Sequence, residues 1–205
     1  MKKHTLLFVT LFLLSLCACT SGGGNPTEAP SFDSGKLTVT FDYEKQSGHG
    51  SNQFAVWIED ADGKLIKTLY ATKFTANGGY KNRPDSIPVW TEKSGLASLQ
   101  KSEVDAITGA TPKAGKLSYD WDCKGADGNA VSPGQYTFMV EGTLRGKNQV
   151  LYAGKIEIGD SPTTADATPD YTYEAADNYP ELSSDSSENS MIGGVTASFV
   201  PNVEN

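Results

Sequence analysis

The sequence is poor in the residue types that build most catalytic and metal sites. Its 205 residues include three cysteines and two histidines, and only Cys123 and His49 lie beyond residue 19. A single cysteine cannot form an internal disulfide, and one cysteine with one histidine cannot complete a tetrahedral zinc site. His49 lies between two glycines, a position more typical of an exposed loop residue than of a catalytic base. We therefore expect the fold to depend on its apolar core.

Other absences narrow the function further. No basic patch is interleaved with aromatic residues, so nucleic acid is not indicated as a partner. No glycine-rich phosphate loop precedes a helix, which excludes the usual site for nucleotide hydrolysis. The segment 120–125 is only superficially similar to a calcium loop, because Lys124 puts an ammonium group where the third oxygen ligand belongs. The sequence therefore gives little indication of a stand-alone enzyme.

The chain has no apolar run long enough to cross a bilayer. The longest such run extends from Thr5 to Leu16 and follows Lys2 and Lys3. As a helix, those residues would reach roughly 18 Å, whereas the hydrocarbon core is about 30 Å thick. A basic start before a short apolar segment is typical of a secretory signal. One interpretation is an ordinary signal peptide that is cleaved nearby, which would leave a soluble protein; the alternative is a lipoprotein signal.

The signal ends in Leu16-Cys17-Ala18-Cys19, which resembles the lipobox of bacterial lipoproteins. In that family the cysteine after the cleavage site is lipidated and becomes the new N-terminus. The resemblance implies a signal peptide at 1–18, a lipid on Cys19, and an extracytosolic protein anchored to a bacterial membrane. Cys17 fits less well because the bulky Leu16 precedes it. By resemblance to the lipoprotein sorting rules, the absence of aspartate after Cys19 indicates the outer membrane, on its periplasmic side or surface.

Composition divides the rest of the chain. Residues 19–35 are rich in Gly, Pro and Ser and predict a flexible tether, and residues 36–201 predict one domain. Nine of the 25 acidic residues, and none of the 17 basic ones, lie from Asp160 onward. The segment 160–190 is therefore predicted to be a solvated acidic insertion. An apolar strand at 195–200 follows it, which favours a long loop before the last strand over a free tail.

Apolar residues alternate with period two through the domain, as in Leu37, Val39, Phe41 and Tyr43. The same pattern predicts strands at 53–60, 64–71, 116–121, 135–141, 150–158 and 195–200. Only Ser94–Val104 has helical spacing. Seven or eight short strands with Gly/Pro turns and one short helix predict an all-β, antiparallel, immunoglobulin-like β-sandwich.

Part of the domain resembles a known module. The segments Phe54–Tyr70, Tyr119–Asp122 and Asp127–Tyr136 look like the immunoglobulin-like domain of flagellar hook-capping proteins. In that module a Trp-Asp pair precedes a hairpin that carries Asp-x-x-Gly and a closing Gly-x-Tyr. The resemblance implies a fold and no chemistry.

One motif has a chemical implication. The segment DAITGAT resembles the flavinylation sequence of exported FMN-binding proteins, in which a magnesium-dependent flavin transferase joins FMN to the last threonine through a phosphoester bond. By resemblance the acceptor is Thr111, FMN is a covalent cofactor, and the other motif residues are Asp105, Thr108, Gly109 and Ala110. The two small residues before Thr111 would let the transferase approach the backbone closely. The alternative is a tight loop between a helix and a strand, and the chain departs from known acceptors by continuing with Pro-Lys-Ala-Gly.

A second resemblance covers most of residues 36–201. Segments 70–75, 87–90, 105–112 and 119–122 together look like a family of predicted periplasmic proteins of unknown function, whose genes often lie beside flavin transferases and membrane redox proteins. This resemblance supports the domain boundaries and implies no established activity. Together with the flavinylation motif, the gene neighbourhood favours the hypothesis of an extracytosolic electron carrier, with a flavin transferase and membrane redox proteins as partners. Trp90, Trp121 and Tyr119 are candidates to stack on the flavin, although buried aromatics are more often core residues. The other hypothesis is a non-catalytic immunoglobulin-like binding or structural module of a cell-envelope complex.

Overall fold

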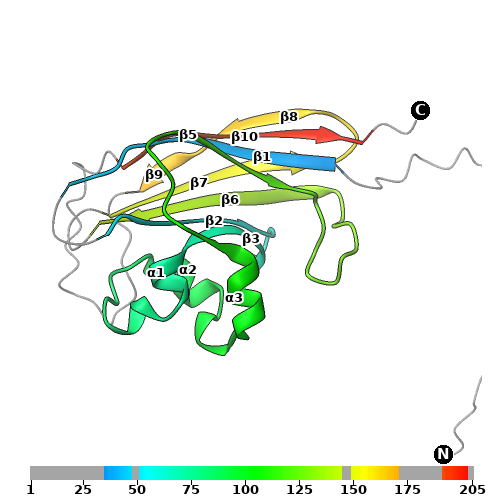
Figure 1. Ribbon diagram of the computed structural model, residues 1–205. Helices are drawn as coiled ribbons and strands as arrows, with labels where there is room; N and C mark the ends of the chain where they lie inside the picture. The colour runs from blue at the N-terminus through cyan, green and yellow to red at the C-terminus, as the bar shows by residue number, and fades with distance from the viewer. Residues whose placement is uncertain (1–34, 48–50, 145–148, 171–190, 203–205) are drawn as a thin grey trace, which may run out of the picture.

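Two β-sheets lie face to face, and a layer of short helices covers the outer face of one of them (Figure 1). The computed structural model describes residues 35–47, 51–144, 149–170 and 191–202. The predicted signal peptide, Cys19 and the tether up to residue 34 lie outside the described residues. The predicted fold class, an all-β antiparallel sandwich, is confirmed.

The first sheet has the strand order β5-β1-β10-β8, and every neighbouring pair is antiparallel. Its strands are β1 (Gly35–Tyr43), β5 (Gly115–Trp121), β8 (Thr163–Asp166) and β10 (Ile192–Pro201). Leu37, Val39, Phe41 and Tyr43 are all buried between the sheets, as their alternation predicts. The opposite face is polar, and there Thr38 donates a hydrogen bond of 2.7 Å to Asp120.

The second sheet has the order β4-β3-β2-β6-β7-β9 and is antiparallel except for the pair β3–β4. Its strands are β2 (Gln53–Glu59), β3 (Leu65–Thr72), β4 (Thr108–Gly109), β6 (Gly134–Thr143), β7 (Gln149–Ile158) and β9 (Thr168–Asp170). Every residue of β2 is buried. The reason is that β2 packs against the first sheet on one side and against the helical layer on the other.

The helical layer occupies the segment between β3 and β4 (Figure 1). It consists of α1 (Lys73–Ala76), η1 (Gly79–Lys81), α2 (Pro88–Lys93), η2 (Leu96–Ser98) and α3 (Lys101–Ile107). The helix predicted at 94–104 is therefore divided. Leu99 is extended, with ψ 140°, and α3 begins after it with a capping box formed by Gln100 and Glu103.

Two apolar cores result. The main core fills the space between the sheets and includes Phe41, Phe54, Trp121 and Phe138. The second lies between the second sheet and the helical layer and consists of Ala55, Trp57, Ala71, Ala76, Ile87, Trp90, Leu96, Val104 and Met139. The apolar spacing at 94–104 thus has another cause than one continuous helix: Leu96 of η2 and Val104 of α3 are both buried in the second core.

The predicted acidic insertion at 160–190 is partly ordered into strands. β8 pairs with β10 and β9 pairs with β7 through backbone hydrogen bonds. The side-chain pattern of these segments does not predict this pairing. Ala165 and Ala167 also pack against the main core. The remainder, 171–190, lies outside the described residues.

Gly154 makes room for a buried ring across the β6–β7 pair. It lies opposite Phe138, and a Cβ added at Gly154 would overlap Phe138 Cζ and lie 2.6 Å from Cε1. Because the Phe138 ring is fully buried and must move, we expect Gly154→Ala to lower the free energy of unfolding by about 1–3 kcal/mol. Urea unfolding measures this.

Gly159→Ala is the matched control, since a Cβ there would meet nothing within 4 Å. We expect that variant to stay within about 0.5 kcal/mol of the wild type. Equal unfolding midpoints for the two alanine variants would contradict the packing argument.

Candidate functional site

The motif segment 105–111 connects the two sheets at their edges. β4 is an edge strand of the second sheet and β5 an edge strand of the first. Figure 1 shows the chain leaving α3, rising along the side of the molecule and entering β5 in the upper layer. The motif therefore lies on the connection that closes one side of the sandwich.

The first motif residue lies outside the loop that contains Thr111. Asp105 is on α3, is exposed, and forms an ion pair with Lys101 one helical turn earlier. Such an exposed pair contributes little to stability. Thr108 and Gly109 form β4, which pairs in parallel with Ala71 and Thr72 at the end of β3.

Tyr70 holds the middle of the motif in place. Its hydroxyl donates a hydrogen bond of 2.8 Å to the carbonyl oxygen of Ala110. A Cβ added at Gly109 would lie 2.7 Å from Tyr70 Cε2, so the backbone packs directly on the ring. This contact is a reason for the small residue at position 109 that the sequence alone does not show.

Thr111 is exposed and lines a cavity of about 470 Å³. The other lining residues come from the motif and from both ends of the loop between β1 and β2: Lys45, Gln46, Ser47, Ser51, Asn52 and Pro112. Cavities of about 300–1,000 Å³ are typical of small-molecule sites. Among the lining residues in the described ranges, Lys45 is the ionisable one, and Asp105 is not part of the lining.

Aromatic side chains pack around Tyr70. Its ring stacks on Phe54 at 5.0 Å and lies 4.9 Å from the ring of Tyr119 on β5. Burial raises the pKa of Tyr70 to about 12, and the nearby hydroxyl of Tyr43 adds to the shift. The pKa of Tyr119 is also raised, first by burial and then by Tyr70 and Tyr43. The Tyr43 hydroxyl is buried and, within the described part of the chain, has no hydrogen-bond partner. The protonated phenol of Tyr70 thus contacts the motif, and the ring of Tyr119 packs beside it.

The two tryptophans proposed to stack on a flavin are core residues. Trp121 is 1% exposed, and its indole N–H donates to the carbonyl of Lys124 at 2.8 Å. Trp90 is fully buried, and its indole N–H donates to Thr68 at 3.0 Å. Of the three candidates, Tyr119 is the partly exposed one.

The raised pKa values predict that the domain loses stability in alkaline solution. Burial raises the pKa of the Cys123 thiol from 9.0 to about 12 and that of Tyr70 from 10.0 to about 12. The unfolded chain loses these protons at the ordinary pKa, whereas the folded protein keeps them to about pH 12. Between those values the folded state binds more protons, so the free energy of unfolding falls as pH rises.

Urea unfolding across this pH range measures the decline. In Cys123→Ala the decline is expected to begin near pH 10, where tyrosine ionises in the unfolded chain, instead of near pH 9. A stability that stays constant from pH 9 to pH 12 would contradict the prediction.

Within the described ranges, no group of three or more His, Cys, Asp or Glu side chains is placed to hold a metal ion. No helix in those same ranges is long and apolar enough to span a membrane.

A family model described as predicted periplasmic protein (DUF2271) matches residues 35–174. The matched region contains the strands β1 to β9, the helical layer, the motif and the described residues that line the cavity, whereas β10 follows it. Comparisons with curated proteins and with solved structures give no match.

Proposed function

This chain belongs to the family of predicted periplasmic proteins, and on that premise we propose that it is an extracytosolic electron carrier with FMN attached covalently to Thr111. The position of Thr111 carries the proposal: its side chain is exposed, and it lines a cavity of small-molecule size. The lining residues in the described part of the chain suit a phosphoryl group, because they include the cation Lys45 and no carboxylate.

Attachment exchanges a phosphoanhydride bond for a phosphate ester bond. In the proposed step the Thr111 hydroxyl oxygen attacks the FMN phosphorus of a flavin adenine dinucleotide bound to a flavin transferase. The pyrophosphate P–O bond breaks, AMP leaves with the bonding electron pair, and the hydroxyl proton passes to the transferase or to solvent. No atom changes oxidation state. Thr111 suits this step because it lies between β4 and β5, outside regular structure, where an enzyme can reach it.

The bound flavin would supply a one- and two-electron redox centre. The chain's own residues supply the position: Tyr70 fixes the loop through Ala110, and the sandwich provides a rigid base. We further propose that a lipid on Cys19 keeps this centre at a membrane. The tether 19–35 would span about 20 Å. Electrons would enter from a membrane redox protein and leave to an extracytosolic acceptor.

Co-expression with an active flavin transferase tests the proposal. We expect flavin fluorescence on the denatured polypeptide in a gel, a mass increase equal to one FMN minus water, and a labelled peptide that contains Thr111. A known acceptor protein in the same cells shows that the transferase is active. If that acceptor is labelled and this domain is not, the redox function fails, and the immunoglobulin-like binding or structural module remains.

A further inference from the structure

The cavity beside Thr111 has a wall that the motif does not supply. Lys45, Gln46 and Ser47 follow β1, and Ser51 and Asn52 precede β2. None of these residues belongs to the motif, yet they share the cavity with its acceptor threonine.

Side-chain hydrogen bonds fix this wall. The buried side chain of Asn52 accepts from the Gln46 amide at 2.7 Å and donates to the Gln46 carbonyl at 2.8 Å. It thereby holds the segment that carries Lys45. The carbonyl of Ser51 accepts a hydrogen bond of 2.7 Å from Arg83 of the helical layer. Both sides of the wall are thus attached to buried groups and set before any ligand arrives.

The lining has a definite chemistry. It offers the ammonium group of Lys45, the side-chain amide of Gln46, and the hydroxyls of serine and threonine, whereas the Asn52 amide already binds the Gln46 backbone. The lining residues that the structure describes include no aromatic ring on which a flavin could stack. Hydroxyls and amides bind polyols, and an ammonium group binds phosphate. The lining therefore suits a phosphorylated polyol better than it suits a planar ring.

We propose that this cavity binds the phosphate and the hydroxylated ribityl chain of the flavin nucleotide, with Lys45 as the counter-ion of the phosphate. The inference rests on the proposed function, because it places the same nucleotide at the same threonine. It adds a binding site for the polar half of that nucleotide, which exists in the protein before attachment. The ring then lies outside the cavity, where redox partners can reach it.

The test compares FMN with riboflavin, which lacks the phosphate, on the unlabelled domain. NMR chemical shifts report binding of each to the wild type, to Lys45→Gln and to Lys113→Gln. Lys113 is the matched control, because it is exposed, lies two residues from Thr111 and does not line the cavity. Both variants lose the same charge.

We expect the wild type and Lys113→Gln to bind FMN about fivefold more tightly than riboflavin. In Lys45→Gln the two ligands should bind equally, and in the wild type added salt should reduce the preference. The inference is overturned if FMN binds no more tightly than riboflavin, if Lys45→Gln keeps the preference, or if Lys113→Gln loses it as well.

This result is separable from that of the labelling experiment. If Thr111 accepts the flavin but Lys45→Gln keeps the preference for FMN, the cavity inference fails and the electron-carrier function stands. If Lys45→Gln loses the preference but Thr111 is never labelled, the site for a phosphorylated polyol stands and covalent attachment fails.

Discussion

Replacing Thr111 by valine is expected to abolish covalent flavin attachment completely, with no loss of fold. Valine has nearly the shape of threonine but lacks the hydroxyl that forms the ester bond. Thr111 is exposed and lies between two strands, so the change should alter the free energy of unfolding by less than about 0.5 kcal/mol. Gel fluorescence and intact mass should both show an unlabelled protein.

Two further variants make this result specific. Thr111→Ser keeps a hydroxyl and is expected to retain labelling, at a lower yield. Thr196→Val removes an exposed hydroxyl from β10, far from the motif in the sequence, and should be labelled like the wild type. Label that persists on Thr111→Val would place the acceptor at another residue and would contradict the assignment of the motif.

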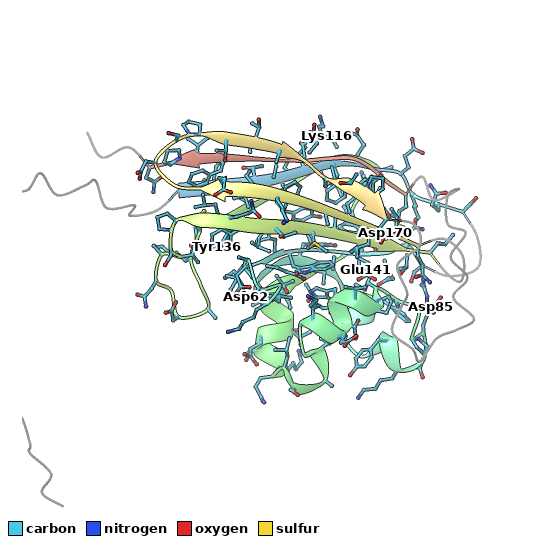
Figure 2. The ribbon with its side chains drawn as sticks, turned by 180° about the vertical axis from the view of Figure 1, so that it is seen from behind. Asp62, Asp85, Lys116, Tyr136, Glu141 and Asp170 are labelled. Carbon is cyan, nitrogen blue, oxygen red and sulfur yellow. The ribbon has the colours of Figure 1, made fainter. Side chains whose placement is uncertain are left out.

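The second large effect is expected at Glu141, on β6. Its carboxylate is fully buried where the second sheet meets the helical layer (Figure 2). One oxygen accepts from the Val89 amide at 3.1 Å and the other from the Trp90 amide at 2.8 Å. The first amides of a helix have no partner within the helix, and a carboxylate in this position caps them. Glu141 thus fastens α2 to the sheet.

We expect Glu141→Ala to lower the free energy of unfolding by about 2–4 kcal/mol, because the buried Trp90 amide and the partly buried Val89 amide lose their acceptor and a void remains. Glu141→Gln should cost less, since it keeps one acceptor oxygen. Urea unfolding measures both, and hydrogen exchange at Val89 and Trp90 locates the effect. Glu92→Ala is the control, an exposed position on the same helix. Equal stability of the two alanine variants would contradict the capping role.

The sheets could be predicted from the sequence because most strands bury one face, which leaves a period-two pattern such as that of 37–43. Three short strands escaped prediction for a physical reason. β4, β8 and β9 are held at sheet edges by backbone hydrogen bonds, to which the side chains contribute little pattern. The helix α2 escaped as well, because its cap Glu141 lies far away in the sequence.

In the candidate site, too, some residues could be predicted from the sequence and others could not. Thr111 was predictable because a short contiguous motif contains it. Lys45 and Asn52 were not, because polar residues near a glycine-rich loop carry no signal of their own. They become neighbours of Thr111 only when the edges of the two sheets come together. The same holds for the contact of Gly109 with Tyr70, which depends on the parallel pairing of β3 with β4.

That parallel pairing also gives the helical layer a modular character. The layer leaves the sheet after Thr72 and returns at Thr108, and these ends are adjacent, since Ala71 pairs with Thr108 and Thr72 with Gly109. A segment whose two ends are adjacent can be lengthened or replaced without moving the sheet, because closing a longer loop between fixed points costs little additional entropy. Evolution or design can therefore change the size and surface of this layer while the acceptor threonine keeps its place on the scaffold.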